Sequence, residues 1–271
     1  LHADFPADLG VKRDEDISCA NMVRMGDKWM LICISHDLGC RYYIGDFKDE
    51  KFLPEYHERM SHNCSDYFAP ETLLTKDGRR VLWTWVFGNA GSLSAIQALP
   101  RELELPKDGK LRIRPLRELK SLRYDEETER NIAVGDGGTY KLEKIKGDAL
   151  EIEIECETPA AKEFGIDVMW NEKQDQKMRI ALNKEARTIK VGSVTAPFEL
   201  KAGEKLVLRI FIDKHLVEVF ANDIQAVFAK DSKYDSERIG TRLFAEGGEF
   251  KVKSVTAWKM RSAYEGKAAF Y

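Results

Sequence analysis

The sequence contains no long apolar run. None of its stretches approaches the roughly 20 consecutive apolar residues that a helix needs to cross a bilayer, so we expect no membrane partner. The opening segment, LHADFPADLG, also lacks the charged and apolar parts of a targeting peptide. Because the sequence does not begin with methionine, we expect that a signal was removed upstream or that the chain is truncated, which slightly favours a secreted or periplasmic location over the cytoplasm.

Neither charge sign is in excess, and metal-ligand patterns are missing. With 43 basic and 46 acidic residues in mixed order, the net charge of -3 gives no basic surface for a nucleic acid, and we expect no such partner. The 5 cysteines stand at spacings that fit neither a CxxC pair nor a zinc site, and the histidines do not cluster, so we predict no metal site. A chain of 271 residues can bury a core without disulfides, and we interpret the cysteines as small buried apolar side chains.

Short β-type runs between turns recur along the whole chain. Examples are KWMLICIS, RRVLWTWVF, KLVLRIFI and LVEVFA, which are bounded by GDK, KDGRR, KAGEK and AND. Strands that follow one another every eight to twelve residues or so, with Gly, Asp and Asn turns between them, are typical of propellers, sandwiches and barrels. The sequence therefore predicts an all-β fold rather than an α/β fold.

Two of these runs predict how their faces are covered. In ALEIEIECE, residues 149–157, the apolar side chains share one face and Glu151, Glu153 and Glu155 share the other, so we expect the glutamates to face solvent. KLVLRIFI, residues 205–212, carries apolar side chains on both faces. It predicts a strand that is covered on both sides, deep in a sandwich.

One segment differs in character from the β-type runs. PLRELKSLRYDEE, residues 115–127, has leucines at a helical spacing, and Pro115 suits a first helical turn. We interpret residues 116–138 as a linker that joins an N-terminal β unit, residues 1–115, to a C-terminal β-sandwich, residues 139–271.

Five segments, taken in order, resemble glycoside hydrolase family 32, the family of invertases, levanases and inulinases. They are YYIGDF (42–47), DYFAPETLLTKDGRRVLWTWV (66–86), LPREL (99–103), GKLRIRPLRELKSLR (109–123), and LRIFIDKHLVEVFAND (208–223) with the closing VTAWKM. The resemblance implies the last part of a five-bladed β-propeller followed by a β-sandwich. It also implies retaining hydrolysis of fructose-containing sugars such as sucrose, levan or inulin, which needs two carboxyl groups and neither a metal nor an organic cofactor.

Two motifs of that family do not occur in this sequence. The family carries its nucleophilic aspartate in an NDPNG-type motif and a stabilising aspartate in an RDP-type motif. The resemblance therefore implies that the nucleophile lies outside this chain. We expect the missing N-terminal blades, as an upstream segment or as a separate chain, to cover strand edges that would otherwise stay unpaired.

The acidic cluster RDEDISCANMV, residues 13–23, contains the candidate acid/base. The family has a glutamate directly before a cysteine, whereas Ser18 precedes Cys19 here, and a serine hydroxyl cannot replace a carboxylic acid as proton donor. Asp16 shares the strand face of Ser18, and Glu15 has the longer reach but needs a bulge, so both are candidates. Two alternatives stay open: the site only binds sugar, with Ser18 among its contacts, or the cluster is a solvated approach to a strand.

Further candidate contacts to the carbohydrate substrate follow from the same resemblance. Asp66 matches an aspartate of the family's DFYA-type segment, and Tyr67 would supply a phenol if the strand register shifts. Trp85 shares a strand face with Trp83, and the pair either stacks on a furanose ring or belongs to the core. His62, in the loop before this segment, either contacts the ligand or is an ordinary loop residue.

The sequence leaves three functions open. The leading hypothesis is a glycoside hydrolase of the β-fructofuranosidase type. The first alternative is a carbohydrate-binding descendant that has lost the chemistry, because Ser18 stands where the family has its acid. The second is a related propeller hydrolase with another sugar specificity.

Overall fold

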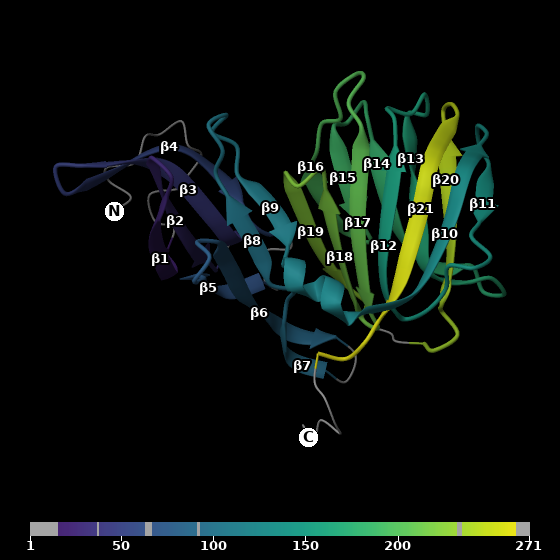
Figure 1. Ribbon diagram of the computed structural model, residues 1–271, viewed down its shortest axis with the longest axis horizontal. Coiled ribbons are helices and arrows are strands. Elements are labelled where there is room, and N and C mark those ends of the chain that lie inside the picture. The colour runs from purple at the N-terminus through teal and green to yellow at the C-terminus, as the bar shows by residue number, and fades with distance from the viewer. Residues whose placement is uncertain (1–15, 37, 63–66, 91–92, 232–234, 264–271) are drawn as a thin grey trace. The chain divides into compact units, whose positions relative to one another are not determined.

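The regular structure of the chain is almost entirely β-strand, which confirms the predicted class. The chain forms two units, Leu1–Leu116 and Arg117–Tyr271 (Figure 1). Within the described part of the chain, no helix is long and apolar enough to span a membrane. The computed structural model describes residues 16–36, 38–62, 67–90, 93–231 and 235–263.

The first unit contains two antiparallel sheets. In one, β1 to β4 follow one another in sequence order; in the other, the order is β5-β6-β8-β9, and β7 also pairs with β6. The strands are β1 (Ser18–Met25), β2 (Lys28–Ser35), β3 (Gly39–Lys48), β4 (Lys51–Arg59), β5 (Tyr67–Leu74), β6 (Arg80–Ala90), β7 (Leu93–Gln97), β8 (Arg101–Glu104) and β9 (Arg112–Pro115).

Local sequence explains the meander of the first sheet. Met25 pairs with Lys28, so Gly26 and Asp27 alone form the turn between β1 and β2. Gly26 has a φ of 62°, a conformation that tight hairpin turns require and that glycine adopts without steric cost. The alternating apolar residues of β2 to β4 then meet on one face, where a buried cluster forms from Leu31, Cys33, Tyr43 and Phe52.

The first strands of the two sheets lie against each other. β5 packs against β1, β2 and β3, and Thr72 Oγ1 of β5 donates a hydrogen bond to Asn21 Oδ1 of β1 at 2.5 Å. The ring centre of Phe68, at the start of β5, lies 6.0 Å from that of His36, which contacts Asp16. The segment around Asp16 is therefore near the start of β5, although about fifty residues separate them in sequence.

Both first strands carry a bulge next to a residue in the left-handed conformation. The ladder of β1 shifts between Ser18 and Asn21, where Cys19 has a φ of 49°. The ladder of β5 shifts between Phe68 and Glu71, where Ala69 has a φ of 46°. A bulge bends its strand and re-aims the neighbouring side chains, and such bulges are common next to active sites.

The second unit consists of two six-stranded sheets whose orders are β10-β21-β12-β17-β18-β19 and β11-β20-β13-β14-β15-β16 (Figure 1). Their facing sides enclose one large apolar core, as in a β-sandwich. The elements are η3 (Arg117–Leu122), β10 (Arg123–Val134), β11 (Thr139–Lys141), β12 (Ala149–Cys156), β13 (Glu163–Asn171), β14 (Gln176–Asn183), β15 (Thr188–Val191), β16 (Val194–Pro197), β17 (Leu206–Asp213), β18 (Leu216–Ala221), β19 (Gln225–Lys230), β20 (Gly240–Glu246) and β21 (Phe250–Met260).

The segment that we predicted to be helical and to serve as a linker is different in the structure. Only Arg117–Leu122 is helical, as a short 3-10 helix, and Arg123–Val134 continues as strand β10. This strand pairs along its length with β21, more than 110 residues further on. The ladder with β21 outweighs the helical spacing of the leucines, because local propensity is weak compared with tertiary pairing. Residues 123–134 are therefore part of the second unit and not a free connection.

The prediction for β12 was wrong at one position. Glu151 was expected to face solvent, but its side chain is fully buried. Its carboxylate accepts hydrogen bonds from Arg123 Nε at 2.7 Å and from Arg209 Nε at 2.9 Å, and the Arg123 guanidinium lies 3.7 Å from the centre of the Trp258 ring. The alternation of the strand was correct, but it could not show that arginines on β10 and β17 would cover the outer face.

The prediction that β17 is covered on both sides is confirmed at its centre. Leu208 and Ile210 belong to the core between the sheets, whereas Phe211 points to the opposite face and is also buried. The cysteines follow expectation in part: Cys33, Cys40 and Cys156 are buried thiols, but Cys19 is exposed.

Candidate functional site

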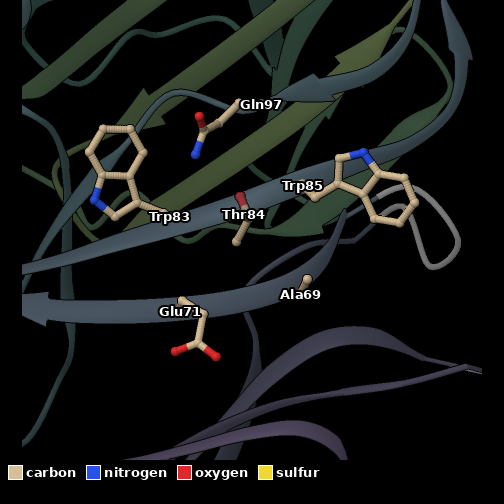
Figure 2. A pocket seen from close by; sticks show the side chains of 6 residues that line it. All are labelled: Ala69, Glu71, Trp83, Thr84, Trp85 and Gln97. Atoms are coloured by element: carbon tan, nitrogen blue, oxygen red, sulfur yellow. The ribbon is translucent and has the colours of Figure 1, made fainter.

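A pocket opens on the sheet of the first unit, over strands β5, β6 and β7. Its volume is about 390 Å³, and Figure 2 shows two indole rings, one carboxylate and one amide around it. The strand register explains this set, because Glu71 is directly opposite Trp83 and Gln97 is directly opposite Trp85. The lining residues are Ala69, Glu71, Trp83, Thr84, Trp85 and Gln97.

The composition of the pocket suits an amphipathic ligand. Trp85 keeps 38% of its surface exposed, so a flat apolar face is open to solvent. Glu71 and Gln97 add polar groups that can accept and donate hydrogen bonds. Aromatic rings beside hydrogen-bonding side chains match the alternating apolar faces and hydroxyl groups of a sugar ring.

A second group of polar side chains surrounds Asp16, just before β1. The carboxylate of Asp16 accepts a hydrogen bond from Ser18 Oγ at 2.8 Å and one from the backbone N–H of His36 at 3.0 Å, and His36 Nδ1 lies 2.7 Å from Oδ2. The buried side chain of Arg41 donates to the backbone carbonyl of Asp16 at 3.2 Å. Asp16 is therefore tied to β1, to the turn after β2 and to β3.

These donors hold Asp16 in its ionised form. The hydrogen bond from the His36 backbone, with smaller contributions from Ser18 and the His36 side chain, lowers the pKa of Asp16 to about 2. A general acid has to be protonated at the working pH, which requires a raised pKa rather than a lowered one. The direction of this shift argues against Asp16 as the proton donor. Asp16 lies just before β1, where its carboxylate accepts the hydroxyl of Ser18.

We expect this arrangement to make stability depend on Asp16 in acid. The folded-state pKa of Asp16, about 2, is below its ordinary value of 3.8, so its stabilisation is complete above pH 4 or so and is lost as the pH falls towards 2. The variant Asp16→Asn should unfold more easily than the wild type at pH 6 and no more easily near pH 2. The difference at pH 6 should stay below about 1 kcal/mol, because the side chain is partly exposed.

Denaturant unfolding at the two pH values measures this effect. The matched control is Asp27→Asn, because Asp27 is an exposed aspartate in the turn of the same sheet. As a substitution on the exposed surface, it should change stability at pH 6 by less than about 0.5 kcal/mol. An Asp16→Asn variant with a pH-independent difference would contradict the assignment.

Phe68 connects the pocket with the Asp16 group. It pairs directly with Trp85 across β5 and β6, and its ring centre lies 6.0 Å from that of His36. The two groups of functional side chains are thus neighbours within one unit. The bulge of β1 at Cys19 adjoins Ser18, and that of β5 at Ala69 lines the pocket.

The other residues that we predicted to act in the site differ in their surroundings. Tyr67 does not suit a sugar contact, because its side chain is fully buried and the Arg101 guanidinium lies 4.6 Å from its ring centre. His62 is half-buried in the segment between β4 and β5. Glu15 and Asp66 lie outside the described residues.

Sequence reasoning missed His36, Glu71 and Gln97. His36 follows β2 in an unremarkable turn, and its contact with Asp16 spans 20 positions. Glu71 and Gln97 could be assigned to the site only once the strand register was known. Glu71 is opposite Trp83, and Gln97 is opposite Trp85. Among the described residues, no group of three or more His, Cys, Asp or Glu side chains is arranged to hold a metal ion.

Models of known protein families match both parts of the chain. Residues 12–115 match the model of the glycosyl hydrolases family 32 N-terminal domain, and residues 118–259 match that of the family 32 C-terminal domain. The chain belongs to glycosyl hydrolase family 32. The site described above lies in the part of this family 32 chain that matches the N-terminal domain.

Curated relatives of the family 32 chain include two groups of hydrolases. The chain is 27% identical over 264 residues to a levanase of Bacillus subtilis, covering 85% of this chain and 39% of the levanase. It is 25% identical over 243 residues to a sucrose-6-phosphate hydrolase of Zymomonas mobilis, covering 82% of this chain and 47% of that protein. The chain therefore spans less than half the length of these relatives.

Solved structures share the fold of the family 32 chain. Fructan 1-exohydrolase IIa from Cichorium intybus superposes with a TM-score of 0.77 at 16% identity, covering 91% of this chain and 62% of that one. Exo-inulinase from Aspergillus awamori gives a TM-score of 0.75 at 16% identity, covering 93% and 58%. A variant of the Cichorium enzyme was solved in complex with 1-kestose, with a TM-score of 0.74 at 18% identity and coverage of 89% and 58%.

Proposed function

We propose that the protein containing this chain cleaves the glycosidic bond of fructose-containing sugars by a retaining mechanism. The observation that carries this proposal is the pocket at Trp83 and Trp85, which adjoins the Asp16 group within the segment matched to the family 32 N-terminal domain. A retaining glycosidase needs a nucleophilic carboxylate and an acid/base about 5 to 5.5 Å apart, and no metal or organic cofactor.

We infer that this chain contributes the acid/base side of the active site and that the nucleophile lies outside it. The sequence holds neither an NDPNG-type nor an RDP-type motif, and the chain covers only 39% of the levanase and 47% of the sucrose-6-phosphate hydrolase. The two sheets of the first unit would then be the last blades of a five-bladed propeller. The preceding blades, on the same or another chain, would supply the nucleophile and cover the edges of β1 to β9.

An activity assay tests the proposal. Purified full-length protein is incubated with sucrose, levan and inulin, and released fructose is measured beside a sample of the 271-residue chain alone. We expect release by the full-length protein and none by the isolated chain. Absence of release from all three sugars by the full-length protein would contradict hydrolysis, and full activity of the isolated chain would contradict an external nucleophile.

A carbohydrate-binding protein without catalysis is the second candidate. It is favoured by Ser18, which cannot donate a proton as a carboxylic acid does, and by the lowered pKa of Asp16. This candidate predicts that calorimetry detects binding of 1-kestose while no fructose appears over days. A related hydrolase with another specificity would instead release a different sugar from a wider panel of glycosides.

Substituting Trp85 should weaken sugar binding in either case. Trp85 presents an exposed indole to the pocket, and loss of a stacking aromatic ring costs about 0.5 to 1.5 kcal/mol beyond the lost area. We expect Trp85→Ala to raise the dissociation constant for 1-kestose by about 3- to 10-fold, as measured by calorimetry on the full-length protein.

The matched control is Tyr140→Ala in strand β11 of the second unit. Tyr140 is an aromatic residue with the same exposed fraction, 38%. Its removal should leave the dissociation constant unchanged. Equal weakening by both variants would show a general loss of stability, and no weakening by Trp85→Ala would place the sugar elsewhere.

A further inference from the structure

The contact between Asp16 and His36 determines which imidazole nitrogen can exchange a proton. Oδ2 of Asp16 lies 2.7 Å from Nδ1 of His36, and Oδ1 accepts the backbone N–H of the same residue. An ionised carboxylate only accepts hydrogen bonds, so Nδ1 carries a proton in both the neutral and the cationic imidazole. Nε2 is therefore the nitrogen that gains and loses a proton.

The imidazole is open to a ligand. The His36 side chain is 69% exposed, at the turn after β2, and its ring adjoins Phe68, which connects the Asp16 group with the tryptophan pocket. Ser18 beside it uses its hydroxyl to donate to Asp16. In the described part of this group, the imidazole of His36 is the side chain whose type changes charge near neutral pH.

We propose that His36, oriented by Asp16, is the proton donor and acceptor for cleavage of the glycosidic bond. This inference rests on the fructoside-cleaving function proposed above and names the residue that replaces the carboxylic acid absent at Ser18. A histidine held through Nδ1 by a carboxylate and acting through Nε2 is an established arrangement for acid/base catalysis in other enzyme classes.

The chemistry balances in two steps. In the first, the nucleophilic carboxylate bonds to the anomeric carbon, the bond from that carbon to the leaving oxygen breaks, and Nε2–H of the His36 imidazolium gives its proton to the leaving oxygen. In the second, a water oxygen attacks the same carbon, the bond to the nucleophile breaks, and Nε2 takes a proton from the water. His36 returns to the cation, and Asp16 stays ionised throughout.

The surrounding charges support this role. Asp16 faces His36 directly from the segment before β1, and its negative charge stabilises the imidazolium. Arg41 of β3 donates to the backbone carbonyl of Asp16. Burial, with a smaller contribution from Asp16, raises the pKa of Cys33 in β2 to about 12, so this thiol stays neutral. β5 contributes the uncharged Phe68.

Substrates with different leaving groups test the proposal. The full-length protein and its His36→Gln variant are assayed on sucrose, whose leaving oxygen needs a proton, and on p-nitrophenyl β-fructofuranoside, whose leaving group departs as an anion. We expect kcat/KM of the variant to fall by about 10²- to 10⁴-fold on sucrose and by less than about threefold on the nitrophenyl substrate. Retained activity on the second substrate also shows that the variant folds.

The pH profile gives a second readout. The donor must be protonated, so kcat/KM of the wild type on sucrose should fall as the pH rises through the range in which imidazolium loses its proton. In Asp16→Asn the imidazole loses the carboxylate that orients it, so kcat/KM should fall more on sucrose than on the nitrophenyl substrate. Asp16 is thus a positioning residue, and equal losses on the two substrates in this variant would contradict its role.

Every other result of this test would contradict the proposed role of His36, each for a different reason. An equal loss on both substrates would assign His36 to structure, and an unchanged rate on sucrose would exclude it from catalysis. If Glu15→Gln shows the selective loss on sucrose instead, Glu15 is the donor. A wild type that cleaves neither fructoside refutes the proposed function together with the inference, whereas an active wild type with an unaffected His36→Gln refutes the inference alone.

Discussion

Replacing Glu151 with glutamine is expected to lower the free energy of unfolding by about 3 to 5 kcal/mol. The carboxylate of Glu151 is fully buried and is shared by Arg123 and Arg209, each of which donates two hydrogen bonds to it. An amide has no charge and only one acceptor oxygen, so the two guanidinium groups, which are themselves largely buried, would lose the negative charge that they share.

The control for this variant is on the same face of the same strand. Glu155 of β12 forms an ion pair with Lys253 at 2.9 Å, but its side chain is 38% exposed and that of Lys253 is 64% exposed. Glu155→Gln should change stability by less than about 1 kcal/mol. Denaturant midpoints of the two variants provide the measurement, and similar midpoints would show that the buried cluster adds no more than a surface pair.

Gly165→Ala is expected to destabilise the second unit by about 3 kcal/mol or more. A Cβ atom at this position in β13 would lie 2.0 Å from the carbonyl oxygen of Ile180, far inside van der Waals contact. The backbone cannot move away easily, because Gly165 pairs with Ala181 on one side and with Phe244 on the other. Relief would require breaking part of a central ladder of the sheet.

Gly135→Ala is the matched control, because a Cβ atom there would meet nothing within 4 Å. It should change stability by less than about 0.5 kcal/mol. Circular dichroism during thermal unfolding can follow both variants. A Gly165→Ala protein that unfolds at the same temperature as the control would show that the β13–β14 ladder can adjust.

The acid/base question shows where sequence reasoning stops. The cluster before Cys19 could be located from its neighbours, and in the structure Asp16 accepts a hydrogen bond from Ser18. The protonation of Asp16 was not predictable, because its largest perturbation comes from the backbone of His36, a group without a sequence signature. This hydrogen bond joins residues 20 positions apart, and it forms because β1 and β2 pair side by side.

For Trp83 and Trp85, by contrast, the sequence predicted part of the candidate site. Their place on one strand face followed from the two-residue period of a strand, and both line the pocket in the structure. Whether that face was open or buried depended on the neighbouring strands, which leave Trp85 partly exposed. The two-residue period did not predict which way Tyr67 faces, because the bulge between Phe68 and Glu71 changes the alternation along β5.

The sequence by itself determined the all-β class, most strands and the turns between them, because alternation and turn chemistry act over a few residues. Only the tertiary structure decided the rest: the pairing that turned residues 123–134 into β10, the arginines that buried Glu151, and the approach of His36 to Asp16. Each of these joins segments far apart in the chain. Their energy comes from long-range ladders and charge-assisted hydrogen bonds, which no local pattern encodes.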